Sequence, residues 1–409
     1  MNQSIGQPEL LKETNRSRLF DIFRRKRLVS RPDLTEITGL SRATIAILVD
    51  ELLKLKLVQE VGFGDSRGGR PPVLLEFNPE AAYVIGAGMH DLEWSVVITD
   101  LDARVVDRET ATIRDAGPDA AIEALVSAVG RIIGRAVGMR LLPGIGIGSP
   151  GLVDTRTGVV KSAVDIGWID VPMADLVGKA LKLNASVANR SKVGALAEFR
   201  YASQRGVQDL IYIAIGTGVA AGIIHQGELY IGTNSSAGEL GHITIVPDGP
   251  QCACGNRGCL QELVSERAIA NRARRYLKEH PGGLLAVETG LHPERLTADE
   301  VLLAAERGDE TAVHVIRETA YYLAIAVGNL INLFNPEMIV LGGPVSQRST
   351  VLVEEVKREV TRRAMAYPLS AVEIVRSSLG MEAGAVGAAS LVLQEADKLV
   401  FASPVHSQR

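Results

Sequence analysis

The stretch Gly238-Glu239-Leu240-Gly241-His242 ends ten residues before Cys252, which begins the run Cys252-Ala253-Cys254-Gly255-Asn256-Arg257-Gly258-Cys259. This run holds all three cysteines of the 409-residue chain. Three thiolates and one imidazole, from Cys252, Cys254, Cys259 and His242, form a complete tetrahedral ligand set for Zn²⁺. Four protein ligands leave no open position for a catalytic water, so the spacing predicts a closed structural zinc site.

Two other interpretations of the cysteines are weaker. In the first interpretation the cysteines are ordinary free or buried thiols. In the second interpretation they form a disulfide. A disulfide is disfavoured because the cysteine count is odd and because the chain begins Met-Asn-Gln-Ser-Ile-Gly-Gln-Pro-Glu, with no apolar leader. We therefore expect a cytoplasmic protein.

Length and composition indicate a globular protein of two or three domains. The apolar fraction is 46%, and glycines interrupt the hydrophobic run 210–224, which favours buried strands over a membrane span. The net charge of −4 argues against a nucleic-acid-binding surface over the whole protein. Basic residues nevertheless gather near the N-terminus, in a pattern that attracts phosphate: Arg16, Arg18, Arg24, Arg25, Lys26, Arg27 and Arg31.

Three helices are predicted in this N-terminal part. The first spans 15–26, where apolar residues recur three and four positions apart. Ser30 is placed to cap a second helix that ends at Gly39, and Ser41 is placed to cap a third. The third helix has one apolar stripe, formed by Ile45, Leu48, Val49, Leu52 and Leu53. Helix, short glycine turn and helix are typical of the helix-turn-helix motif.

The first turn of the third helix is the expected DNA-reading element. It carries Ser41, Arg42, Ala43 and Thr44, of which Arg42 suits guanine and the two small residues suit a thymine methyl group. Two strand-like runs, 57–62 and 73–77, then flank a segment rich in glycine, proline and arginine. This pattern predicts a wing whose Arg67 and Arg70 enter a narrow minor groove, with a solvated hairpin tip as the alternative.

The remainder of the chain has an α/β pattern. Hairpins are predicted at 83–100 and 210–224, and a strand at 338–344. Helices are expected at 120–137, 265–278, 309–333 and 383–398. Because a glycine-rich strand hairpin opens both halves, we expect two duplicated α/β lobes.

The body resembles the ROK family of sugar kinases and sugar-responsive repressors. The resemblance rests on Gly216-Thr217-Gly218, on the stretch 238–242 and on the cysteine run, whose spacing matches the zinc motif of that family. It extends through Val187-Ala188-Asn189 and the segment 335–343. With its predicted N-terminal winged helix, the chain resembles the repressor branch of that family, which includes the Mlc and NagC regulators and the xylose repressors.

This resemblance implies an actin-like, hexokinase-like fold with a sugar held between two lobes. The expected divisions are a winged-helix domain at 1–80, a first lobe at 81–190 with the C-terminal helix 383–399 packed back on it, and a second lobe at 191–382 with the zinc loop 242–262.

Three departures from the kinase pattern predict that the chain is not an enzyme. Active members have Asn-Asp where this chain has Asn189-Arg190, and a guanidinium cannot accept a proton. They have Asp-x-Gly-Gly-Thr where this chain has residues 88–92, which include His90 and Asp91. The third glycine of a Gly-Gly-Gly run near the expected adenosine site is Pro344.

The expected sugar contacts are better kept. The resemblance places them at Asp165, Asn189, Glu239, His242 and Gln261, where Gln261 replaces a family glutamate. Carboxylates and amides pair well with vicinal hydroxyls, although Asp165 and Glu239 also fit structural roles. His242 is expected to ligate zinc through one nitrogen and to face the sugar with the rest of its ring.

Arg190 allows two interpretations. It either binds a carboxylate or phosphate of an acidic effector, or it forms an ion pair with a nearby acid such as Glu198.

The sequence therefore predicts a repressor of carbohydrate-utilisation genes. Its expected partners are double-stranded palindromic operator DNA, a sugar or sugar derivative, and a second or further copies of the chain in a homodimer or homotetramer. The alternatives are a sugar kinase with an appended DNA-binding module and a repressor controlled by a partner protein.

Overall fold

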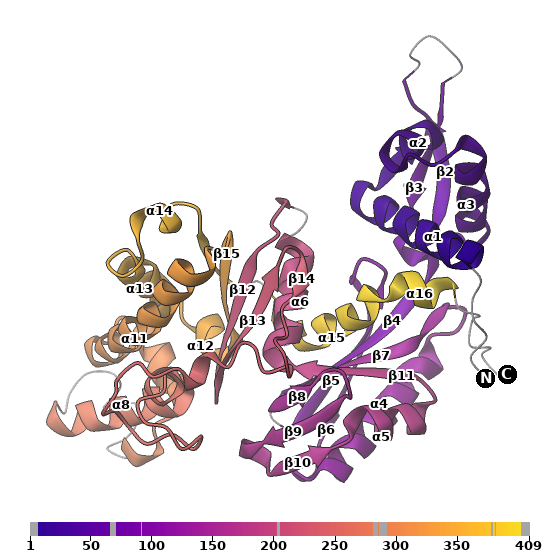
Figure 1. Ribbon diagram of the computed structural model, residues 1–409. Coiled ribbons are helices and arrows are strands. Elements are labelled where there is room, and N and C mark those ends of the chain that lie inside the picture. The colour runs from indigo at the N-terminus through magenta and orange to yellow at the C-terminus, as the bar shows by residue number, and fades with distance from the viewer. Residues whose placement is uncertain are drawn as a thin grey trace.

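The computed structural model describes residues 7–65, 71–90, 92–202, 205–280, 285, 293–377, 379–380 and 382–401. A small helical unit stands beside two larger α/β lobes (Figure 1). Within the described ranges, no helix has the length and apolar character needed to cross a membrane.

The N-terminal unit is a winged helix. Helices α1 (Gln7–Lys26), α2 (Arg31–Thr38) and α3 (Arg42–Lys54) pack with a small sheet of strand order β1-β3-β2, formed by β1 (Leu28–Ser30), β2 (Val58–Phe63) and β3 (Val73–Phe77). The predicted caps are confirmed: Ser30 forms a capping box with Asp33, Gly39 ends α2 at φ 72°, and Ser41 caps α3. Helix α1 begins at Gln7, eight residues before the predicted start.

The first lobe is built on a five-stranded sheet. Its strand order is β11-β7-β4-β5-β6; the pairs β11–β7 and β7–β4 are parallel, and the pairs β4–β5 and β5–β6 are antiparallel. The strands are β4 (Tyr83–His90), β5 (Glu93–Asp100), β6 (Val105–Thr112), β7 (Leu141–Ser149) and β11 (Asn184–Asn189). Helices α4 (Pro118–Arg135) and α5 (Met173–Leu181) cover one face, next to a smaller sheet of β8 (Leu152–Asp154), β9 (Val159–Ala163) and β10 (Trp168–Val171).

The second lobe repeats this plan. Its sheet has the order β14-β13-β12-β15-β16, with strands β12 (Leu210–Ile215), β13 (Val219–His225), β14 (Glu228–Leu229), β15 (Met338–Gly342) and β16 (Glu373–Arg376). Its large core includes residues of α8 (Glu266–Glu279), α10 (Ala298–Glu306), α11 (Glu310–Phe334) and α13 (Thr350–Val360). The predicted hairpins, the strand at 338 and the long helices are therefore present.

Two helices join the lobes. Helix α6 (Arg190–Ala202) packs on β12 and β13 of the second lobe, while α15 (Ala383–Gln394) packs on β4 and β7 of the first, and the two helices contact each other. Their contact needs a glycine, because a Cβ on Gly387 would lie 1.7 Å from the carbonyl oxygen of Val193. The close contact of α6 with α15 thereby connects the two lobes.

The predicted C-terminal helix is two helices. It breaks at Glu395, and the short α16 (Ala396–Phe401) turns to pack on α1 of the winged helix. The ring of Phe401 lies 6.3 Å from that of Phe20, and the guanidinium of Arg16 stands 3.9 Å from the Phe401 ring centre. The prediction of one helix was wrong because this tertiary contact, which redirects the chain, leaves no local pattern.

The winged helix shares a hydrophobic core with the first lobe. Leu19 and Phe23 of α1 belong to one buried cluster with Val84 and Leu101 of the lobe and with Val392 of α15. Burying apolar side chains on both sides of a contact opposes its separation. The winged helix is therefore packed on the body through apolar side chains of α1.

Candidate metal centre, effector site and nucleic-acid interface

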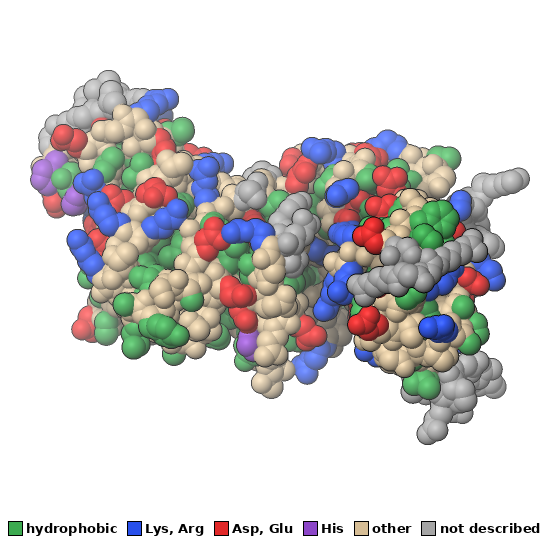
Figure 2. All heavy atoms as spheres, turned by 90° about the horizontal axis from the view of Figure 1, so that it is seen from above, with side chains coloured by type: hydrophobic (Ala, Val, Ile, Leu, Met, Phe, Trp, Pro, Cys, Tyr) green, Lys and Arg blue, Asp and Glu red, His purple; other side chains and the backbone are tan. Residues whose placement is uncertain are grey.

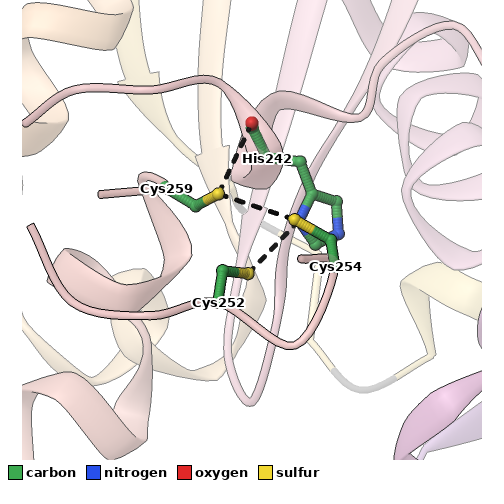
Figure 3. Close-up of side chains that lie close together, drawn as sticks. All are labelled: His242, Cys252, Cys254 and Cys259. Atoms are coloured by element: carbon green, nitrogen blue, oxygen red, sulfur yellow. Dashed lines mark hydrogen bonds between the residues drawn. The ribbon is translucent and has the colours of Figure 1, made fainter. Parts of the chain in front are cut away.

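The three cysteines and His242 converge (Figure 3). Their four ligand atoms all lie within 4.8 Å of one another, with 3.7 Å between the Sγ atoms of Cys254 and Cys259 and 3.7 Å between Sγ of Cys252 and Nδ1 of His242. Tetrahedral zinc with Zn–S bonds of about 2.3 Å separates two sulfurs by about 3.8 Å. The donor set and its spacing therefore fit Zn²⁺.

The loop that carries the cysteines is held by its own backbone. The backbone of Cys259 pairs with that of Thr244 in an isolated antiparallel β-bridge. The amide of Cys252 donates to the carbonyl oxygen of Asn256 at 2.8 Å. Gly258 has φ 65°, and a Cβ there would lie 1.5 Å from the carbonyl oxygen of Val246. Only glycine fits this position, so Gly258, directly before Cys259, is part of the fold of the site.

The thiols differ in their surroundings. Burial raises the pKa of Cys259 to about 12, whereas the backbone amide of Asn256 lowers the pKa of the exposed Cys254. A bound Zn²⁺ would favour the thiolate form of each cysteine and would fix the loop that positions His242. These four residues would hold the metal with no position left for substrate.

Gln261 faces this metal-ligand set. It is the first residue of α7 (Gln261–Val264), and its Nε2 donates to Sγ of Cys252 at 3.6 Å. A hydrogen bond to a ligating sulfur is a common way to orient it. The position predicted for sugar binding thus contacts the metal-ligand set.

Asn189 links several parts of the expected effector site. It ends β11, its Nδ2 donates to the carbonyl oxygen of Gly151, and its Oδ1 accepts from the amide and hydroxyl of Ser191 at 2.8 and 2.7 Å. The same hydroxyl lies 3.2 Å from the carbonyl oxygen of Ala221, whose amide donates to the carbonyl oxygen of Gly238 at 2.7 Å. The start of α6 and the loop that carries Glu239 are thus joined through β13.

The other predicted effector residues divide into two groups. Half-buried Glu239 directly precedes a single helical turn (Leu240–His242), and His242 turns Nδ1 toward the cysteines, which leaves Nε2 on the other side of its ring. Asp165 instead lies on an exposed turn of the first lobe, where it makes no hydrogen bond or ion pair with any described residue. Among the predicted sugar contacts, Asp165 is therefore the residue that no described hydrogen bond connects to the segments carrying the other four.

Lys192 is a candidate that sequence reasoning missed. It lies in the first turn of α6, three residues after Asn189, and only 1% of its surface is exposed. Burial lowers the pKa of its ammonium, and the charge of Glu239 opposes that shift. The small and apolar residues that follow it, 193–197, are the sequence signal that this part of the helix is buried.

Arg190 and Pro344 are two of the residues that depart from the kinase pattern. Arg190 is the first residue of α6, and its charge acts on the buried hydroxyl of Tyr212. The ring of Pro344 packs on Gly216, 3.1 Å from where a Cβ would stand. Glu198, the suggested ion-pair partner of Arg190, receives a hydrogen bond from the hydroxyl of Ser377.

His90 ends β4 and is half-buried, whereas Asp91 lies outside the described residues.

The first turn of α3 presents a small polar surface. Arg42 and Ala43 are exposed, and Arg42 makes no hydrogen bond or ion pair with any residue that the structure describes. The Oγ of Ser41 accepts from the amide of Thr44 at 3.1 Å and lies 2.9 Å from its hydroxyl oxygen. Arg67 and Arg70 lie outside the described residues.

Most of the N-terminal basic cluster has a structural role. Arg24 donates to the carbonyl oxygen of Leu393 at 3.1 Å, and Arg27 pairs with Asp102 at 2.6 Å. Arg16 and Arg31 contact acids and Arg18 contacts the carbonyl oxygens that end α2. The prediction of a phosphate-attracting cluster applies best to the exposed Arg25 and Lys26.

The family model of the ROK family matches residues 83–395, which span both lobes and α15. The chain belongs to the ROK family. A putative xylose repressor of a Caldicellulosiruptor species is 31% identical over 97% of this chain and 99% of its own. A solved ROK-family transcriptional regulator, described as a homologue of the Escherichia coli Mlc protein, has a TM-score of 0.82 at 26% identity and covers 95% of this chain and 98% of its own.

A kinase of the family covers a smaller share of the chain. A ROK glucokinase of Streptomyces griseus, solved with glucose and a nucleotide analogue, has a TM-score of 0.67 at 28% identity, covering 76% of this chain and 99% of its own. The N-terminal unit is thus shared with the full-length regulators.

Proposed function

We propose that this ROK protein is a sugar-responsive transcriptional repressor of carbohydrate-utilisation genes. The observation that carries the proposal is the winged helix packed into one apolar core with a ROK lobe. Its exposed Arg42 and Ala43 suit base contacts in a major groove. Regulators similar to this chain over nearly its whole length support the same reading.

The body is proposed to bind sugar without phosphorylating it. Arg190 stands where the family kinases have their proton acceptor, and a guanidinium cannot take a proton from a sugar hydroxyl. Pro344 packs on Gly216, at the turn expected to approach the nucleotide phosphates. The contacts that hold Asn189 and the Glu239 loop together run through Ser191, Ala221 and Gly238.

Helix α6 is proposed to connect the effector site with the winged helix. Asn189 and Lys192 lie at its start, and Arg200 lies near its end. Burial lowers the pKa of Arg200 to about 9, and the charges of Arg24 and Asp102 also act on it. A sugar that favours one arrangement of the lobes would therefore change the environment of α1.

Two copies are proposed to bind a two-fold symmetric operator. The sugar alters the spacing of their recognition helices, and only its differential affinity for the two arrangements drives that change.

The test is operator binding by the full chain. An operator selected from random DNA is titrated with protein while a sugar panel is added, and phosphate transfer from ATP to each sugar is assayed in parallel. The proposal expects at least one sugar to change operator affinity with no phosphorylated product. A phosphorylated sugar supports the kinase alternative, and operator binding that no sugar alters supports control by a partner protein.

A further inference from the structure

Lys192 and Glu239 are two buried or half-buried charges that do not pair. Lys192 is 1% exposed, and its ammonium has no hydrogen-bond partner and no carboxylate within 4.0 Å among the described residues. The carboxylate of Glu239 likewise has no such partner within the described ranges. A lysine that served only to neutralise Glu239 would be expected within bonding distance of it.

The ammonium of Lys192 is unpaired among the described residues but is not fully enclosed, so Nζ contributes to the 1% of the residue that is exposed. The desolvation of a charge is costly unless a partner compensates it. The amide end of α6 adds partial positive charge at the same turn, and Arg190 adds a full one.

Lys192 and Glu239 belong to segments that are held against each other. Ser191, next to Lys192, bonds to β13 through the carbonyl oxygen of Ala221, and the amide of Ala221 bonds to Gly238, next to Glu239. A ligand at this place would meet an anion that accepts from hydroxyls and a cation that donates to an acidic group.

We propose that the effector is an acidic sugar, with a carboxylate or phosphate group bound by Lys192 and hydroxyl groups bound by Glu239. This inference rests on the proposed sugar-binding site. It names the class of sugar and assigns its selection to a residue outside the predicted contacts. A uronate and a sugar phosphate share the anion that Lys192 recognises.

The experiment uses the full, zinc-loaded chain and matched sugars. Calorimetry compares hexoses and pentoses with their uronates and phosphates, for wild type and for Lys192→Met. One charged hydrogen bond corresponds to about a tenfold or larger preference for the acidic member. The preference should disappear in Lys192→Met and persist in Lys179→Met, which alters an exposed lysine of α5.

Two further readouts keep the inference testable. If Lys192→Met does not fold, Lys192→Gln replaces it, and wild-type affinity for the acidic sugar should fall as salt rises. Equal or tighter binding of neutral sugars, an unchanged preference in the variant, or no binding of any acidic sugar at millimolar concentration would overturn it. Binding of an acidic sugar without any effect on the operator would instead overturn the proposed repressor mechanism and leave the inference standing.

Discussion

Arg27 of the winged helix and Asp102 of the first lobe form an ion pair, with 2.6 Å between Nη1 and Oδ2. The Asp102 side chain is 7% exposed, and its backbone amide is held by the carboxylate of Asp100 at 2.8 Å. The position of Asp102 is therefore also held by a contact within the first lobe, in addition to its ion pair with Arg27. The pair lies where the chain leaves α1, so it anchors the winged helix to the body.

Asp102→Ala should loosen this anchor. The expected loss in free energy of unfolding is about 1 kcal/mol, because Arg27 remains partly exposed and solvent screens part of the attraction. The larger effect is expected on the change in operator affinity caused by sugar. Chemical denaturation and fluorescence anisotropy measure the two quantities. Lys161→Ala, which removes an exposed pair on the first lobe, is the control and should change neither.

Gly387→Ala tests the contact of α15 with α6. The added Cβ would lie 1.7 Å from the Val193 carbonyl oxygen, so the helices must move apart, at a cost of about 3 kcal/mol. Gly130→Ala in α4 is the matched control, because nothing lies within 4 Å of its added Cβ. The control should gain up to about 1 kcal/mol from helix propensity. Thermal unfolding that ranks the two variants equally would refute this packing account.

Removal of one metal ligand should release zinc. Cys254→Ser alters an exposed thiol, so any loss of stability reports the metal and not lost packing. We expect about one zinc per wild-type chain, much less in the variant, and a clear fall in thermal midpoint. Elemental analysis and calorimetry measure both. Arg257→Ala, in the same loop, should keep its zinc; full zinc content in Cys254→Ser would mean that the four residues are not the site.

Arg42→Ala should weaken operator binding by about 1–3 kcal/mol and relax specificity at one base pair. Arg25→Ala, at an exposed position on α1, should weaken all sequences alike and reduce the salt dependence of binding by about one counterion. Anisotropy titrations at several salt concentrations separate the two. Identical behaviour of the variants would exclude Arg42 as a base-reading residue.

Local signals were sufficient for the caps at Ser30, Gly39 and Ser41 and for the convergence of the cysteines, because these features depend on neighbours in sequence. Long-range packing decided the rest. Lysines are usually exposed, so the burial of Lys192 was hidden until α6 was placed. The break at Glu395 depends on the contact of α16 with α1 in the same way.

The same distinction explains the basic N-terminal cluster. Arg24 and Arg27 carry the same charge as Arg25 and Lys26, and composition treats the four alike. The structure turns the first two toward Leu393 and Asp102, which lie far along the chain. Charge density predicted a surface for phosphate, whereas two of these four residues bind the winged helix to the body.

In the proposed mechanism, sugar binding in the body controls DNA binding by the winged helix without phosphate transfer. The most direct measurement is the operator affinity of the full chain across a sugar panel, with ATP present and product analysis in the same samples. We predict that at least one sugar changes operator affinity by about tenfold or more and is recovered unphosphorylated. A sugar that is phosphorylated while operator affinity stays constant would contradict it.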